Sequence, residues 1–219
     1  MKIIAISGGS GTGKSTISQN LSQILPNSAT IHVDPIMHAV DAKMEKEILE
    51  AIKPNIQEGV HPFNYYFESY KNVQTWCNMI KNPVNDMIEE TIKKYHDKDY
   101  VIIDWAFMQW CDIFNKCDYT ICMKADQEIA QERLIKRLKS LDKDDIKSYW
   151  AFQDWALKNR VDFTAIDKRG YKCEYQIVNN GTLEELSNNV KKFVNGVISG
   201  ESTSVNKFFK FKWDKKGGL

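Results

Sequence analysis

The sequence predicts a three-layer α/β fold around a five-stranded parallel sheet, and two observations support this prediction. Five short apolar runs rich in β-branched residues alternate with longer segments of helical periodicity, a pattern typical of parallel strands joined by crossover helices. The first run leads directly into a glycine-rich turn and then a helix. With 219 residues, 42% of them apolar, the chain suits one α/β domain with a small inserted lid.

The apolar runs and periodic segments set the expected elements. The predicted strands span residues 2–7, 30–33, 100–103, 118–123 and 175–178. The predicted helices span residues 14–25, 36–52, 71–81, 84–96, 126–139 and 182–195. Asn82-Pro83 is expected to separate two of these helices, because the residue before a proline disfavours helical geometry. Thr182, with Glu185 three residues later, predicts a capping box at the start of the last helix.

The glycine-rich turn after the first strand meets the pattern G-x-x-x-x-G-K-[ST] in full. Glycines let successive backbone N–H groups point at a polyphosphate, and the start of the next helix adds further unpaired N–H groups. Lys14 is expected to reach the β- and γ-phosphates, and the Ser15 hydroxyl to bind Mg²⁺. We therefore predict that ATP and Mg²⁺ bind at Gly8, Gly9, Ser10, Gly11, Thr12, Gly13, Lys14, Ser15 and Thr16.

Two acidic residues follow predicted strands, at the sheet edge where open parallel sheets bind ligands. Asp34 follows the second strand, and Asp104 directly follows the apolar third strand. An acid after four apolar residues has the form of a Walker B motif, so Asp104 is predicted to hold Mg²⁺ directly or through water. Asp34 is a candidate for chemistry on an acceptor. The alternative role of each residue is to cap a helix.

Two arginines, Arg133 and Arg137, lie four residues apart in the predicted helix 126–139 and therefore share one face. Two guanidinium groups in this arrangement suit the charge that spreads over a migrating phosphoryl group. Their alternative role is a solvated basic face balanced by Glu128 and Glu132.

Three regions differ in composition from the elements around them. The region of about residues 36–96 is mostly helical and contains the aromatic stretch 63–70, interpreted either as a satellite core or as a wall of the acceptor site. The charged segment 140–172 is typical of a lid that excludes water from a phosphoryl transfer. The basic-aromatic tail, residues 196–219, either packs on its own domain or contacts nucleic acid or an acidic lipid surface.

The overall composition limits partners and compartment. Thirty basic and 29 acidic residues give a net charge of +1, so bulk charge favours neither nucleic acid nor membrane binding. The five cysteines show no paired spacing, which predicts reduced thiols and no disulfide framework. No stretch has transmembrane length. We expect a soluble, cytoplasmic protein that is a monomer or a small homo-oligomer.

Several motifs beyond the glycine-rich loop resemble those of the dephospho-CoA kinases, a family of nucleoside monophosphate kinase-like P-loop kinases. The resemblance runs from Met1 to about Asn195. The segments that carry it are Val33-Asp34-Pro35-Ile36-Met37-His38, Ile80-Lys81-Asn82-Pro83-Val84, Val101-Ile102-Ile103-Asp104, Arg133-Leu134-Ile135-Lys136-Arg137 and Ile177-Val178-Asn179-Asn180-Gly181-Thr182-Leu183-Glu184-Glu185-Leu186.

This resemblance implies a P-loop kinase domain over residues 1–195 and transfer of the ATP γ-phosphate to the ribose 3′-hydroxyl of dephospho-CoA. It implies that Asp34 takes the proton of the acceptor hydroxyl, and we expect Asn180 and Gly181 to border the adenine. The sequence departs from the family pattern at Asn82, at the segment starting with Trp105, and at Tyr149, which stands where the family's lid has an arginine. Compared with the family pattern, about ten extra residues (near 159–172) separate Gln153, the glutamine of the predicted lid, from the fifth strand.

Two other functions remain open at this stage. A nucleoside or nucleotide kinase of the uridine kinase type would share the loop, the acid after the second strand and the lid. A regulatory P-loop ATPase would use the basic tail to contact nucleic acid or membrane. The dephospho-CoA kinase and the nucleoside or nucleotide kinase differ in their small-molecule acceptor. Of the three functions, only the regulatory ATPase requires the tail.

Overall fold

A computed structural model of the chain describes residues 1–52, 57, 62–66, 68–138, 173–200 and 209. Its centre is a parallel sheet of five strands, as the sequence predicts, and the strands lie in the order β2-β3-β1-β4-β5. The strands are β1 (Lys2–Gly8), β2 (Ser28–His32), β3 (Tyr100–Asp104), β4 (Tyr119–Lys124) and β5 (Tyr175–Val178). Because all five strands run the same way, their carboxyl ends meet at one edge.

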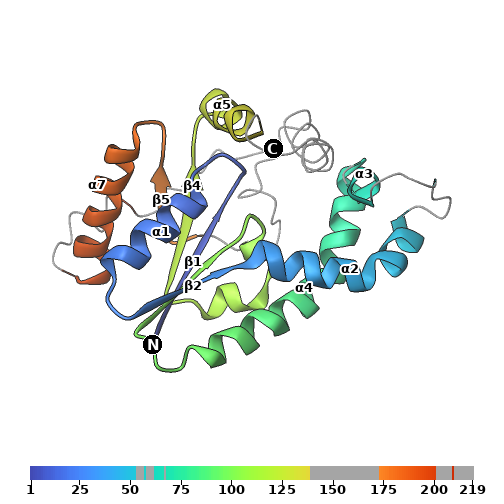
Figure 1. The fold of residues 1–219 in the computed structure, drawn as a ribbon, viewed down its shortest axis with the longest axis horizontal. Helices are drawn as coiled ribbons and strands as arrows, with labels where there is room; N and C mark the ends of the chain where they lie inside the picture. The colour runs from blue at the N-terminus through green and yellow to red at the C-terminus, as the bar shows by residue number, and fades with distance from the viewer. Residues whose placement is uncertain (53–56, 58–61, 67, 139–172, 201–208, 210–219) are drawn as a thin grey trace.

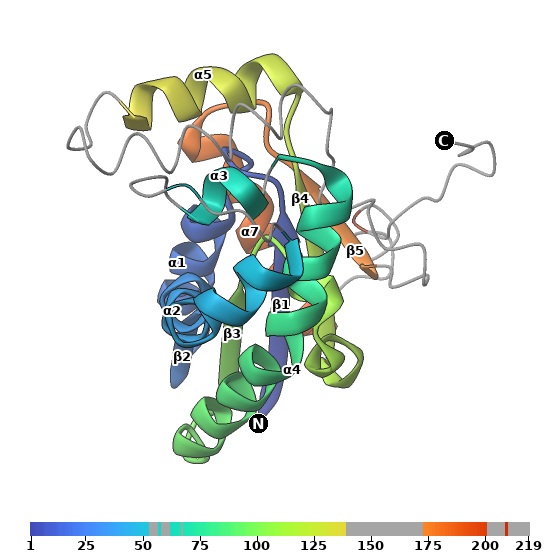
Figure 2. The same cartoon turned by 90° about the vertical axis from the view of Figure 1, so that its right-hand side faces the viewer.

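Helices cover both faces of this sheet (Figures 1 and 2). One face carries α1 (Lys14–Ile24) and α7 (Leu183–Phe193), and α7 is followed by the π-helical turn η3 (Val194–Ile198). The other face carries α2 (Val33–Ile52), α3 (Pro62–Tyr66) and α4 (Tyr70–Lys94). Two short 3₁₀ turns, η1 (Met108–Trp110) and η2 (Asp112–Lys116), lie on this second face as well. The sheet therefore separates two hydrophobic clusters, one beneath each helical layer. A further helix, α5 (Gln127–Leu138), lies beside the turn that follows β1.

The predicted break at Asn82-Pro83 is wrong, because α4 is one helix with Pro83 inside it. A proline inside a helix costs about 3 kcal/mol through the lost N–H bond and ring crowding. Burying one large apolar side chain returns about 1.5–3 kcal/mol, and α4 buries a whole face of them. Tertiary burial thus outweighs the local preference. The buried apolar side chains of α4 are Val73, Trp76, Cys77, Ile80, Val84, Ile88 and Ile92.

The boundary between β2 and α2 also differs from the predicted one. The second strand ends at His32, and Val33 already begins α2, so Asp34 lies within the first helical turn. Pro35 is well tolerated there, since the first turn of a helix does not use its N–H groups internally. The predicted capping box at the start of α7 is confirmed: Thr182 accepts from the Glu185 N–H, and Glu185 accepts from the Thr182 N–H.

The prediction that the cysteines form no disulfide is wrong at one pair. Cys122 and Cys173 are bonded, with their Cα atoms 5.6 Å apart. Cys122 lies in β4, and Cys173 lies two residues before its neighbour β5, so the pairing of these strands brings the two thiols together. Fifty-one residues separate them in sequence, which is why spacing did not reveal the pair. The remaining three, Cys77, Cys111 and Cys117, are free thiols.

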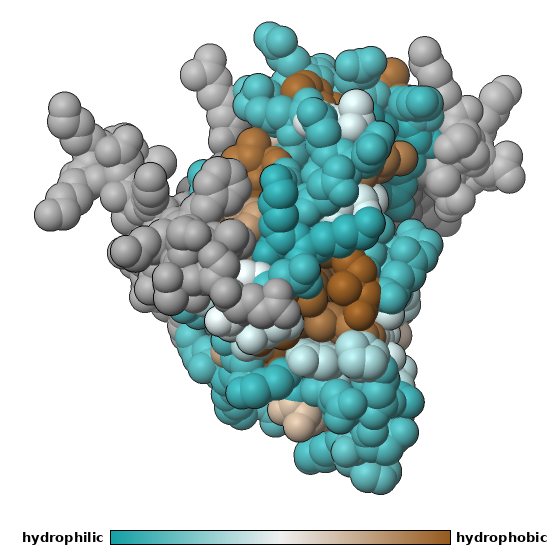
Figure 3. Space-filling model, turned by 90° about the vertical axis from the view of Figure 1, so that its left-hand side faces the viewer, coloured by the Kyte–Doolittle hydropathy of each residue, from teal (hydrophilic) through white to brown (hydrophobic). Residues whose placement is uncertain are grey.

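The tail residue Phe209 packs on the domain itself. Phe209 is buried against Phe193 of α7, with ring centroids 5.6 Å apart. The surface on the α7 side of the molecule is mostly hydrophilic, with a smaller hydrophobic area among the polar residues (Figure 3). Among the described residues, no helix has the length and apolar character needed to cross a membrane.

Thiol titration of the denatured chain without reductant tests the disulfide. We expect only Cys77, Cys111 and Cys117 to react, because Cys122 and Cys173 are bonded to each other. After reduction all five cysteines should react. In the control variant Cys173→Ser, every remaining cysteine should react without reductant. Reaction of all five cysteines in the unreduced wild-type chain would contradict the pairing.

Candidate active site

The turn between β1 and α1 has the left-handed backbone that its glycines permit. Gly11 and Gly13 have φ angles of 78° and 97°. A side chain at either position would also collide with its surroundings, since a Cβ on Gly11 would meet the Ala130 carbonyl of α5 and one on Gly13 would meet the Asn179 amide. The turn is therefore packed closely between α5 and the loop after β5, with no room for residues other than glycine at these two positions.

Lys14 is held over this turn at the start of α1. Its ammonium group donates to the Gly9 carbonyl at 3.1 Å, and the Thr12 hydroxyl donates to the same carbonyl at 2.7 Å. Burial is the largest effect on Lys14 and lowers its pKa. The negative charges of Asp34 and Asp104 act to raise this pKa, and the positive charge of Arg137 acts to lower it. Asp34, Asp104 and Arg137, three other residues predicted to act in catalysis or metal binding, therefore lie close enough to Lys14 for their charges to act on it.

Asp104 ends β3 and is 7% exposed. Its carboxylate accepts from the Ser18 hydroxyl at 2.6 Å and from His32 Nδ1 at 3.0 Å. The Ser18 hydroxyl also lies 3.0 Å from the Ser15 carbonyl, so this side chain connects the two residues predicted to bind Mg²⁺. A buried carboxylate needs such donors, because its desolvation is otherwise costly. The sequence pattern predicts a site at Asp104 but gives no sign of its two donors, Ser18 and His32.

These residues fit a magnesium ion chemically. Mg²⁺ prefers oxygen ligands, and proteins usually bind it through one or two carboxylates together with substrate phosphates. Ser15 is exposed at the first turn of α1, two residues after Gly13, and offers a hydroxyl oxygen. Asp104 offers a carboxylate connected to the same turn through Ser18. Both oxygen donors predicted from the sequence thus belong to one end of the sheet.

Asp34 is exposed in the first turn of α2, at the same edge of the sheet. His38 is one helical turn further along the same face and is also exposed. The His38 ring lies 5.8 Å from that of Phe63, whose own ring contacts Tyr66 and Trp76. An exposed acid beside the phosphate loop has the access that an incoming hydroxyl requires.

The two arginines of α5 differ in their surroundings. The Arg133 guanidinium donates to the Asn179 carbonyl at 2.8 Å and to the Gly181 carbonyl at 3.1 Å, and so holds the loop between β5 and α7. Arg137 is exposed and its charge reaches Lys14. A contact of Arg133 with a migrating phosphoryl group stays a prediction, whereas its contact with the loop is present in the structure.

Asn179 is a further residue of the site, beyond those predicted individually from the sequence. It is 6% exposed, and its amide donates to the Thr12 carbonyl of the phosphate loop at 3.0 Å. Its neighbour Asn180 accepts from the Asp126 N–H at the start of α5 with its side-chain oxygen. The loop after β5 is therefore tied to both the phosphate loop and α5. The signal for Asn179 was present in the sequence, since it lies in the last of the motif segments quoted above.

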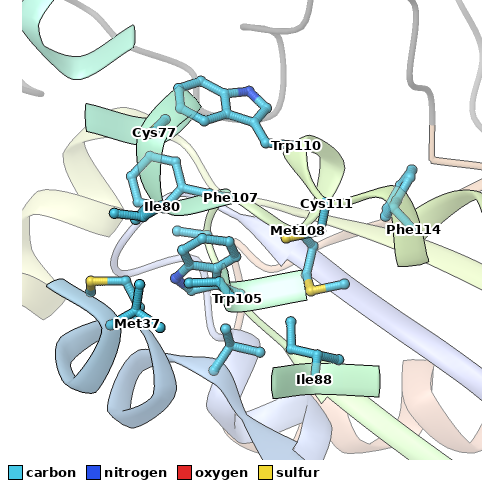
Figure 4. Packing of buried hydrophobic residues seen from close by; sticks show 14 of the residues in the cluster. Met37, Cys77, Ile80, Ile88, Trp105, Phe107, Met108, Trp110, Cys111 and Phe114 are labelled. Carbon is cyan, nitrogen blue, oxygen red and sulfur yellow. The ribbon is translucent and has the colours of Figure 1, made fainter. Parts of the chain in front are cut away.

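The described aromatic residues of α3, of α4 and of the segment after β3 mostly form core. Tyr66 is fully buried and stacks on Trp76, and Trp76 in turn meets Phe107 edge to face. Figure 4 shows Phe107 close to Trp105, beneath the helices of this layer. The satellite-core interpretation therefore holds for the buried rings, whereas Phe63 is partly exposed and its ring lies near that of His38. The predicted lid, including Tyr149, lies outside the described residues.

Relatives of known function match this chain along most of its length. A curated dephospho-CoA kinase of Aquifex aeolicus is 22% identical over 201 residues, which cover 88% of this chain and 95% of the relative. A curated dephospho-CoA kinase of Borreliella burgdorferi is 24% identical over 210 residues, which cover 91% of this chain and 96% of the relative.

Solved structures share the fold. TT1252 from Thermus thermophilus superposes with a TM-score of 0.57 at 16% identity, covering 92% of this chain and 98% of its own. A dephospho-CoA kinase from Campylobacter jejuni superposes with a TM-score of 0.50 at 15% identity, covering 91% and 99%. The family model described as AAA domain matches residues 4–153, which is more than half of the sequence. The chain therefore belongs to the AAA domain family.

Proposed function

We propose that the protein is a kinase that transfers the γ-phosphate of ATP to the ribose 3′-hydroxyl of dephospho-CoA. The observation that carries this proposal is that the charges of Asp34, Asp104 and Arg137 all act on Lys14 of the phosphate loop. The full-length similarity to two curated dephospho-CoA kinases supports the choice of acceptor. The reaction would take place in the cytoplasm on a small-molecule substrate.

The proposed roles follow from position. The loop N–H groups and Lys14 bind the β- and γ-phosphates, and Ser15 and Asp104 hold Mg²⁺, which when bound neutralises phosphate charge. Arg137, near Lys14, stabilises the charge on the transferred group. Arg133 keeps the loop of Asn180 and Gly181 in place, and this loop borders the adenine.

Asp34 acts on the acceptor. The acceptor hydroxyl gives its proton to the Asp34 carboxylate as its oxygen forms a bond to the γ-phosphorus. The bond between that phosphorus and the β,γ-bridging oxygen breaks, and ADP leaves with the electron pair. Phosphoryl transfer requires mainly positioning and charge stabilisation, which these fixed side chains provide.

A nucleoside kinase of the uridine kinase type is the competing assignment, and the acceptor alone separates the two. The regulatory ATPase is less supported, because Phe209, the one described residue within the basic-aromatic part of the tail, packs on the domain's own core. Truncation of the tail would have to abolish function for that alternative to hold.

Consumption of ATP against a panel of acceptors tests the proposal. We expect turnover with dephospho-CoA and none above background with uridine or nucleoside monophosphates. Asp34→Asn should lower kcat by about 100-fold or more, because general base catalysis contributes about 10²–10⁴-fold. Binding of an ATP analogue by the variant serves as the control for folding. Turnover of uridine without turnover of dephospho-CoA, or an unchanged kcat in Asp34→Asn, would reject the proposal.

The two arginines of α5 should give different kinetic effects. Arg137→Ala should lower kcat by about 10²-fold with little change in the KM for ATP, because it removes charge stabilisation from the transferred group. Arg133→Ala should raise the KM for ATP by about tenfold, since it releases the loop after β5 and each lost charged hydrogen bond is worth about 1.5–3 kcal/mol. Arg133→Lys should behave as Arg133→Ala, because a lysine ammonium cannot reproduce the paired hydrogen bonds that the planar guanidinium donates to the Asn179 and Gly181 carbonyls. Equal effects at both positions would contradict the division of roles.

A further inference from the structure

His32 and Asp104 are the last residues of two neighbouring strands. β2 and β3 are parallel and paired so that His32 stands opposite Asp104. Both side chains therefore emerge at the carboxyl edge of the sheet, beside the phosphate loop. His32 Nδ1 lies 3.0 Å from Oδ2 of Asp104 and 3.1 Å from Oδ1.

The direction of this hydrogen bond follows from the chemistry of its partners. An ionised carboxylate can only accept, so Nδ1 of His32 must carry the proton and donate it. Ser18 donates to the same carboxylate from α1 at 2.6 Å. Asp104 is thus held between one donor from α1 and one donor from β2, which restricts the rotation of its carboxyl group.

The exposure of the two side chains indicates that their contact is not a matter of core packing. The Asp104 side chain is 9% exposed, whereas the His32 side chain is 56% exposed. A ring with more than half of its surface in solvent contributes little burial. Its close approach to a carboxylate that would bind metal is therefore better explained by the hydrogen bond itself than by hydrophobic stabilisation.

We propose that His32 is a positioning residue for the metal site, whose Nδ1–H holds the Asp104 carboxylate in the orientation that Mg–ATP requires. This inference rests on the proposed role of Asp104 in binding Mg²⁺. Groups that hold a metal-binding carboxylate by hydrogen bonds typically change metal affinity by about 10–100-fold when they are removed. His32 acts through Asp104 and need not touch the substrate.

Three substitutions separate this role from a structural one. His32→Asn places an amide nitrogen near the position of Nδ1 and keeps the donor. His32→Gln extends its amide further along, and His32→Ala removes the donor altogether. His96→Gln is the matched control, because His96 is exposed in the turn before β3, at the opposite edge of the sheet. Thermal unfolding of each variant shows that it folds.

Calorimetric titration with a non-hydrolysable ATP analogue, with and without Mg²⁺, is the test. We expect His32→Ala and His32→Gln to bind the analogue about tenfold more weakly than wild type in Mg²⁺, and equally well without it. His32→Asn and His96→Gln should bind within about threefold of wild type under both conditions.

The other outcomes overturn the inference. Wild-type affinity of His32→Ala in Mg²⁺ would show that Asp104 does not need the imidazole. Equal weakening with and without Mg²⁺, or failure of His32→Asn to restore binding, would indicate a general structural effect. The titration contains no acceptor, so a missing turnover of dephospho-CoA would reject the proposed function and leave the result for His32 readable. If the nucleotide affinity of the wild-type chain does not depend on Mg²⁺, both the proposed function and the proposed role of His32 are overturned.

Discussion

The parallel pairing of β2, β3 and β1 is the constraint on which the site depends. In this register Asp104 stands opposite Ile6 of β1 on one side and His32 of β2 on the other. The same β1 leads, two residues after Ile6, into the turn that presents Lys14. A shift of β3 by one residue would move Asp104 to the other face of the sheet and separate it from these neighbours.

A second set of contacts closes the site from the opposite side. Asn179 links the end of β5 to the phosphate loop at Thr12, and Arg133 links the loop between β5 and α7 to α5. These bonds join segments more than 40 residues apart, and the missing side chains of Gly11 and Gly13 leave space for them. The nucleotide end of the site is therefore one connected unit built from three separate parts of the chain.

The sequence predicted what depends on local pattern. The order of strands and helices, the phosphate loop and the capping box at Thr182 each need only a few neighbouring residues, and the structure agrees with them. The error at Pro83 arose because burial of one face of α4 outweighs a local preference. The Cys122–Cys173 bond depends on strand pairing that no spacing rule encodes.

Ser18 and His32 could not be predicted as site residues for the same reason, because their contacts depend on long-range pairing and packing. Ser18 and Asp104 are 86 positions apart, and His32 and Asp104 are 72 apart, so neither contact leaves a mark in the local sequence. His32 follows an ordinary β-branched run, and Ser18 is one of several polar residues in α1. Only the register of β2 with β3 and the packing of α1 on the sheet bring them to one carboxylate.

Phosphorus NMR of a reaction containing ATP and dephospho-CoA tests the central claim most directly, because it identifies the bond that is formed. The proposed reaction predicts a new phosphomonoester signal on the ribose 3′-oxygen of the acceptor, with ADP formed in equal amount. Formation of ADP with only inorganic phosphate, and no new phosphomonoester, would contradict the account and assign the site to ATP hydrolysis.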